Sequence, residues 1–258
     1  MRASLRTATA AAVLLLPRLL CAEPAPPTGR WHATLEPVPG LEVAFGMKVE
    51  AKGGGLTGAL VNGASESRFT SVSWDGETLT LALDHYDGRL VARAVGASLA
   101  GTFVRAIPSG KIELPFRATL AAPPVPRPPK GSPAISGEWG VEMGEGDKAQ
   151  RLLATFRQDG GRATGTLLGP TGDYGPMHGT WDGQALVLTV FDGVFVYRLE
   201  GTVGEGGALS GTFRTRSGAS TPWKGRRLDA AGAASWLPGG GSIVRAKDPD
   251  APVRFSFL

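Results

Sequence analysis

The sequence predicts an all-β protein made of two tandem antiparallel units, each a β-meander or small barrel. One hairpin pattern occurs twice, because Trp74–Leu81 matches Trp181–Leu188 in its turn and in the order of its apolar residues. A Gly-Thr-Phe segment also recurs, within Leu99–Phe103 and within Leu209–Phe213. The 38 glycines and 20 prolines, against 7% aromatic residues, are typical of many short strands joined by tight turns.

The length of 258 residues suits two modest domains, since a unit of roughly 100 residues can bury an adequate core without a metal or a disulfide. The passage 121–134 reads AAPPVPRPPKGSPA, which predicts a stiff, extended and solvated linker. The predicted organisation is a signal peptide at 1–22, a first unit at 29–120, the proline-rich linker at 121–134, a second unit at 135–228, and a further linker with an extended tail at 229–258.

Within both units apolar residues alternate along the chain, as in Thr78–Leu83 and Ala185–Val190. This period of two indicates strands with one buried face. Asn-Gly and Asp-Gly pairs separate the strands and suit the positive φ angles of two-residue hairpins. We expect six to eight strands per unit in a meander that closes or curls to remove its edges. No later stretch shows a period of 3.6, so no long helix is expected.

The first residues have the pattern of a secretory signal. Arg2 and Arg6 precede a short apolar run at Ala8–Leu16, and Leu20–Ala22 offers a cleavage site. The run is too short to cross a bilayer as a helix, so no membrane span is expected in the mature chain. Cys21, the one cysteine, either leaves with the signal or carries a lipid anchor. The protein is therefore expected to be periplasmic or secreted, or held at a membrane by that lipid.

The net charge of +4 is small and its charges are interspersed, so no nucleic-acid surface is predicted. The chain has no Gly-x-Ser-x-Gly elbow, phosphate loop, dinucleotide-binding fingerprint or zinc-ligand spacing. The glycine run at Gly53–Gly55 is interpreted as a turn. The sequence therefore predicts no catalytic residue, no metal and no cofactor.

The most unusual passage in the second unit is Thr171–Gly179. It combines a carboxylate at Asp173, an aromatic ring at Tyr174 and an imidazole at His178. One interpretation is a ligand-binding loop, and the other is an ordinary connection closed by glycine and proline. His85 lies in a polar hairpin turn, where neighbouring side chains do not converge.

Five tryptophans have two interpretations. They either line an apolar ligand cavity or fill the barrel cores, and the small size of the units favours the core. Trp139 and Trp181 are the ligand-binding candidates in the second unit. Trp31 and Trp139 each open a unit as Gly-x-Trp, which suggests that each closes one end of a barrel.

The second unit carries Gly172-Asp173-Tyr174, His178-Gly179-Thr180 and Phe191-Asp192-Gly193, and the last residues of the sequence include Phe255-Ser256-Phe257. These motifs resemble the β-rich region that precedes the catalytic domain in bacterial thiol–disulfide oxidoreductases of the TlpA/ResA type. The tail is similar to the start of their thioredoxin-like domain. The family's Cys-x-x-Cys pair has no counterpart here, so the resemblance transfers no catalytic residue and implies an accessory region.

Three functions follow as hypotheses. The first is a non-catalytic exported module that acts beside a periplasmic redox partner or binds a client protein. The alternative is a calycin-like small-ligand carrier, similar to lipocalins and avidin, because an eight-stranded barrel can hold one ligand. The third is a barrel hydrolase or isomerase that uses Asp173, Tyr174 and His178.

Overall fold

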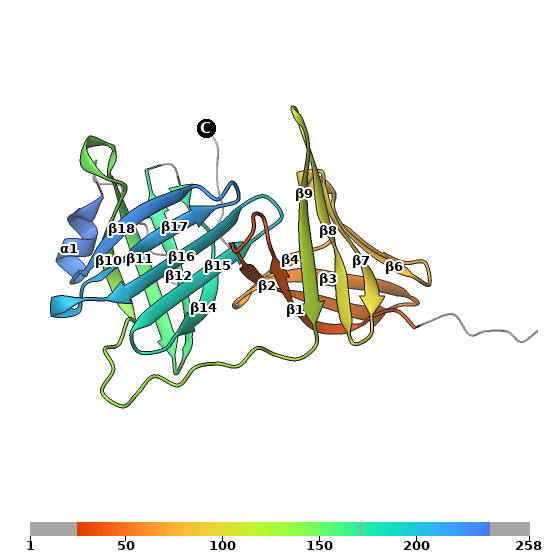
Figure 1. The fold of residues 1–258 in the computed structure, drawn as a ribbon, viewed down its shortest axis with the longest axis horizontal. Coiled ribbons are helices and arrows are strands. Elements are labelled where there is room, and N and C mark those ends of the chain that lie inside the picture. Colours follow the sequence, from red (N-terminus) through yellow and green to blue (C-terminus); the bar gives the residue numbers. More distant parts are fainter. Residues whose placement is uncertain (1–24, 171, 238–258) are drawn as a thin grey trace, which may run out of the picture.

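The computed structural model describes residues 25–170 and 172–237, and it confirms the predicted all-β class. Two closed antiparallel barrels of eight strands follow one another along the chain (Figure 1). Each barrel belongs to a nine-stranded sheet, in which one short strand lies outside the closed ring. The linker runs past one end of both barrels, and we call this end of each barrel its linker end.

Barrel 1 is an up-and-down meander whose first strand pairs with its last. The ring closes because β1 pairs with both β2 and β9, while β2 pairs with β3. Its strands are β1 (Gly29–Leu35), β2 (Val43–Lys52), β3 (Gly55–Asn62), β4 (Ser65–Arg68, outside the ring), β5 (Ser71–Trp74), β6 (Thr78–Leu83), β7 (Gly88–Val95), β8 (Ser98–Ile107) and β9 (Gly110–Thr119).

Barrel 2 repeats this topology strand for strand. Here β10 pairs with β11 and β18, and β11 pairs with β12 to close the ring. Its strands are β10 (Gly137–Met143), β11 (Gln150–Asp159), β12 (Arg162–Gly169), β13 (Gly172–Asp173, outside the ring), β14 (Met177–Trp181), β15 (Ala185–Phe191), β16 (Val196–Val203), β17 (Leu209–Thr215) and β18 (Ser220–Arg227).

The repeated Trp-Asp-Gly turn has the same hydrogen bonds in both barrels. The Asp75 carboxylate accepts the backbone N–H of Thr78 at 2.7 Å, and that of Asp182 accepts the N–H of Ala185 at 2.7 Å. These backbone hydrogen bonds hold the pKa of both aspartates below their usual range. The aspartate therefore fixes the hairpin by satisfying backbone donors that the turn leaves free.

The repeated Gly-Thr-Phe segment depends on glycine because neighbouring strands approach closely there. A Cβ atom at Gly101 would lie 2.0 Å from the Val91 carbonyl oxygen, and one at Gly211 would lie 1.9 Å from that of Glu200. No side chain fits such a distance. This contact explains the mid-strand glycines of β8 and β17.

A short helix, α1 (Ala230–Trp236), packs on the outside of barrel 2, within a range for which the sequence predicted a linker. The Asp229 side chain caps it by accepting the Gly232 N–H at 2.7 Å. The Trp236 indole N–H donates to the Leu152 carbonyl oxygen at 2.9 Å. The helix was missed because so short an alanine- and glycine-rich segment shows only two buried positions.

Candidate functional site

The hairpin between β15 and β16 leaves barrel 2 and enters barrel 1. Phe191 is fully buried in the core of barrel 1, together with Val196. The Phe191 ring meets the ring of Phe45 edge-on at 4.8 Å and that of Phe103 at 4.9 Å, measured between centroids. One end of barrel 1 is thus closed by a residue of barrel 2.

Polar contacts surround this aromatic plug. The Asn62 side-chain amide donates to the Phe191 carbonyl oxygen at 2.9 Å, and its oxygen accepts the Phe191 N–H at 3.5 Å. The Thr189 hydroxyl donates to the Ala44 carbonyl oxygen at 2.8 Å. Asn62 and Thr189 are the two buried polar residues of the described chain. Their bonds satisfy groups that the contact removes from water. We call this contact between the barrels the junction.

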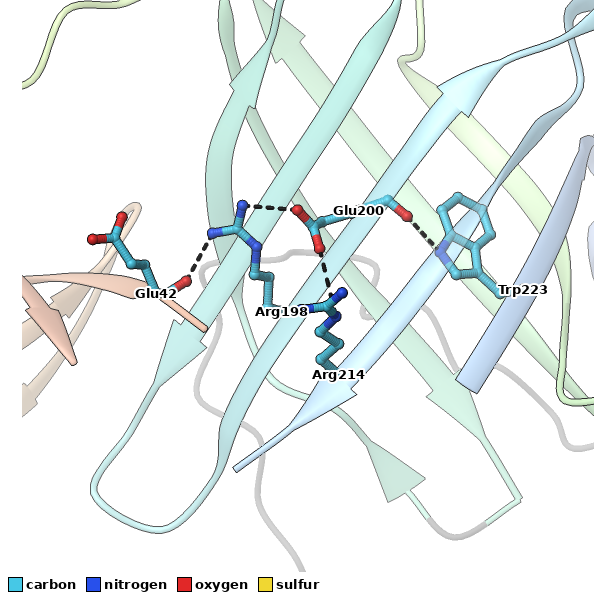
Figure 2. Close-up of polar contacts among 5 residues, drawn as sticks. All are labelled: Glu42, Arg198, Glu200, Arg214 and Trp223. Atoms are coloured by element: carbon cyan, nitrogen blue, oxygen red, sulfur yellow. Dashed lines mark hydrogen bonds and ion pairs between the residues drawn. The ribbon is translucent and has the colours of Figure 1, made fainter. Parts of the chain in front are cut away.

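An arginine–glutamate network extends the junction along the outer face of barrel 2 (Figure 2). One Arg198 Nη donates to the Glu42 carbonyl oxygen of barrel 1 at 2.7 Å, and the other donates to the Glu200 carboxylate at 2.8 Å. Arg214 lies 3.9 Å from the other oxygen of that carboxylate. The Glu200 carbonyl oxygen accepts the Trp223 indole N–H from within the barrel at 2.9 Å. Arg198 therefore links the backbone of barrel 1 to a glutamate on strand β16 of barrel 2.

Two histidines lie near the junction. The turn at Gly63 covers His178, since a Cβ atom at Gly63 would lie 3.6 Å from the His178 Cβ. The His178 Nδ1 is buried without a hydrogen-bond partner among the described residues. Burial, and then the nearby His32, lower the pKa of His178 to about 4. Burial also lowers the pKa of His32, with Arg162 and Arg30 acting in the same direction.

Replacing Thr189 by valine should lower the free energy of unfolding by about 1–2 kcal/mol. The substitution keeps the shape of the side chain but leaves the Ala44 carbonyl oxygen without its donor across the junction. Urea denaturation of the full chain measures the effect. Thr202→Val on the exposed face of β16 is the matched control and should change stability by less than about 0.5 kcal/mol. Equal losses in both variants would show that the cross-barrel bond contributes nothing.

The structure does not gather the residues of the predicted binding loop around one point. The exposed Asp173 accepts hydrogen bonds from the Thr166 hydroxyl and from the Gly175 N–H. Tyr174 turns to the barrel and packs edge-on against Phe213, with ring centroids 5.6 Å apart. His178 lies on strand β14 rather than in a loop, and it faces the junction.

The tryptophan candidates lie in the core of barrel 2. Trp139 is 2% exposed, and its indole N–H donates to the Ile135 carbonyl oxygen at 2.8 Å. Trp181 is fully buried, and its indole nitrogen has no hydrogen-bond partner among the described residues. His85 sits in the turn between β6 and β7, with its ring against Tyr86. Cys21 lies outside the described residues.

Sequence reasoning missed Phe191 and Asn62, the two central residues of the junction. Asn62-Gly63 was interpreted as a hairpin turn, and Phe191-Asp192-Gly193 as a turn and as one motif of the TlpA/ResA resemblance, so neither was predicted to join the units. One signal was present, because the apolar Phe191 directly follows the apolar Val190 and so breaks the alternation of β15. Four consecutive buried residues, Leu188 to Phe191, result from this break.

Across residues 25–170 and 172–237, no three His, Cys, Asp or Glu side chains come together as potential metal ligands. The helices in these ranges include none with the length and apolar character to span a bilayer.

No family model matches this chain, and no curated protein matches it significantly. Two solved structures are similar to it. One is a DUF3598-family protein of unknown function from Nostoc punctiforme, with 12% identity, 78% of this chain and 96% of that chain covered, and a TM-score of 0.27. The other is a candidate outer membrane protein from Bacteroides fragilis, with 14% identity, coverages of 78% and 97%, and a TM-score of 0.27. Both likenesses are too weak to assign a role to this chain.

Proposed function

We propose that this chain is a non-catalytic, exported β module that acts beside a thioredoxin-like thiol–disulfide oxidoreductase, by positioning it or by holding a client protein. The observation that carries the proposal is the junction. Its aromatic plug and its hydrogen bonds couple the two barrels into one body, which suits a scaffold that presents a surface in fixed geometry. The resemblance of the second unit and the tail to TlpA/ResA-type proteins supports the choice of partner.

Export is part of the proposal, on the strength of the N-terminal charge and apolar run. Fusing residues 1–28 to alkaline phosphatase, which is active only after export, tests it. We expect phosphatase activity, and its loss when Ala8–Leu16 is deleted. Labelling with radioactive palmitate, with Cys21→Ser as the control, distinguishes a lipid-anchored protein from a freely secreted one.

The redox role is tested by two measurements on the purified chain. In an insulin-reduction assay the chain alone should give no turnover, since a single cysteine cannot form a Cys-x-x-Cys pair. Biolayer interferometry should detect binding to a periplasmic thioredoxin-like oxidoreductase encoded in the same genome. Insulin turnover by the chain would refute the non-catalytic role, and absence of binding to every such oxidoreductase would refute the redox partnership.

A small-ligand carrier is the second candidate, and one observation favours it. The buried Trp181 indole N–H lacks an acceptor among the described residues, and such a group normally bonds to a protein atom, a water or a ligand. The predicted ligand is small and presents an oxygen acceptor. Tryptophan emission should then shift when the ligand binds, and Trp181→Phe should abolish the shift. If no compound of such a panel changes the tryptophan emission, that result would count against the carrier function.

A further inference from the structure

The two histidines near the junction belong to different barrels. In barrel 1, His32 points outward from β1, since the residues on either side of it are buried, and it lies opposite Gly46 of β2. In barrel 2, His178 on β14 pairs in register with Thr164 of β12 and with Thr189 of β15. Thr189 is the residue whose hydroxyl donates to the backbone of barrel 1. The row of side chains that contains His178 is therefore part of the contact surface between the barrels.

The closed junction favours the neutral form of the His178 ring. The turn at Gly63 of barrel 1 covers this row, because a Cβ atom there would lie 3.3 Å from the Thr164 Cγ2 and 3.6 Å from the His178 Cβ. The buried Nδ1 atom of His178 has no hydrogen-bond partner among the described residues. A neutral imidazole can leave this nitrogen unprotonated, whereas an imidazolium must carry a proton on it. Protonation therefore buries a positive charge together with an N–H donor that lacks an acceptor.

The groups around the two histidines also oppose protonation. Burial lowers the pKa of His178, and His32 lowers it further. Burial lowers the pKa of His32, and Arg162 and Arg30 act in the same direction. Four carboxylates on or next to β2, β4 and β16 are already ion-paired: Glu42 with Arg117, Glu50 with Lys48, Glu66 with Arg30 and Glu200 with Arg198. None of these four carboxylates contributes to the pKa of either histidine, so acid adds positive charge to the junction without neutralising it.

The architecture allows the junction to open without unfolding either barrel. The strands form two separate sheets, and each ring closes by a pair within one barrel, β1 with β9 and β10 with β18. The contacts across the junction include the Phe191 plug and the side-chain hydrogen bonds of Asn62, Thr189 and Arg198. When these contacts part, the proline-rich linker still holds both barrels on one chain, and both histidines gain access to water.

We propose that the junction is an acid-operated hinge: protonation of His178, aided by His32, separates the two barrels and withdraws Phe191 from barrel 1 while both barrels stay folded. The open state exposes Phe191 and the apolar end of barrel 1, including Phe45 and Phe103, which the closed state buries. The protein is thus one rigid body at neutral pH, and in acid a growing fraction of molecules exposes an additional apolar surface. The hinge is a property of the chain alone and does not depend on the redox partnership proposed above.

Hydrogen exchange of the full chain, resolved by NMR, tests the hinge through the Phe191 amide, which donates to the Asn62 side chain across the junction. After correction for intrinsic exchange rates, the equilibrium constant for opening at this amide should rise about a hundredfold between pH 7 and pH 4, because the open state restores the ordinary pKa of 6.5 to His178. The Leu199 amide, within the ladder of β16, is the reference for global unfolding. It should have a smaller opening constant than Phe191 and a steeper dependence on urea.

Two variants isolate the contribution of His178. His178→Gln cannot be protonated at this position and should remove most of the hundredfold rise at the Phe191 amide. His85→Gln, in an exposed turn of barrel 1, is the matched control and should retain the full rise. If His178→Gln does not fold, NMR titration of the His178 ring in the original protein takes its place, and its midpoint is expected at about pH 4.

Three results would overturn the proposal. Equal opening constants and equal urea dependence for Phe191 and Leu199 at every pH would show that acid acts only through global unfolding. An opening constant at Phe191 that does not change with pH, or that rises equally in His178→Gln, would show that His178 does not control the hinge. A titration midpoint of the His178 ring near its ordinary pKa of 6.5 would show that water already reaches this ring in the closed state.

Discussion

Replacing Phe191 by alanine should lower the free energy of unfolding by about 3–5 kcal/mol, the usual cost of removing a buried phenyl ring. The ring is fully buried between Phe45 and Phe103, so its loss leaves a cavity in the core of barrel 1. Because the altered residue belongs to a strand of barrel 2, the damage should appear in the other barrel. Hydrogen exchange should accelerate in β6–β8 more than in β16–β18.

The matched control is Phe195→Ala in the same hairpin. Phe195 is 48% exposed and only stacks on Tyr197, so its loss should cost less than about 1 kcal/mol. Denaturant unfolding of the full chain, followed by circular dichroism, compares the two variants. Similar stability of both would mean that Phe191 does not seal barrel 1, and the rigid coupling in the proposed function would lose its basis.

Lowering the pH should lower the free energy of unfolding through the protonation of His178. The folded state lowers the pKa of this histidine from 6.5 to about 4, so folding favours the neutral imidazole. The contribution of the neutral imidazole to the free energy of unfolding is complete above pH 6.5. It is lost as the pH falls toward 4, because the unfolded chain binds the proton more tightly than the folded chain does. The shift corresponds to about 3 kcal/mol lost between pH 7 and pH 4.

Other groups titrate in the same range, so the effect is isolated by comparison with His178→Gln. Glutamine keeps a polar side chain on β14 but cannot be protonated. Stability curves from urea denaturation, measured at intervals between pH 7 and pH 4, should converge as the pH falls, with the original protein losing about 3 kcal/mol more than the variant. Parallel curves would show that His178 is solvated in solution. His32 remains in both proteins, so only its electrostatic coupling to His178 contributes to the difference.

The fold could be predicted because its signals are local. The alternation in Thr78–Leu83, the aspartate turns at Asp75 and Asp182, and the glycines of the Gly-Thr-Phe segments each depend on residues a few positions apart. Helix α1 was not predicted because its stability comes from packing Trp236 against barrel 2, and no local hydrophobic period reveals this contact. In such a short helix, tertiary contact outweighs intrinsic propensity.

The candidate site could not be predicted in the same way. The passage at Asp173, Tyr174 and His178 attracted attention for its composition, yet the three side chains face Thr166, the barrel core and the junction respectively. Asp173 ends β13, Tyr174 lies in the connection that follows it, and His178 lies on β14, so the three residues belong to different elements. Most residues of the proline-rich linker are exposed, and a few of them, including Pro126 and Ser132, touch turns of barrel 2.

Hydrophobic periodicity and turn chemistry suffice to define two repeated antiparallel units, because both act between neighbouring residues. The junction joins Asn62 to Phe191 across 129 positions and Thr189 to Ala44 across 145. No repeating pattern marks such pairs, and only the closing of both barrels brings them within bonding distance.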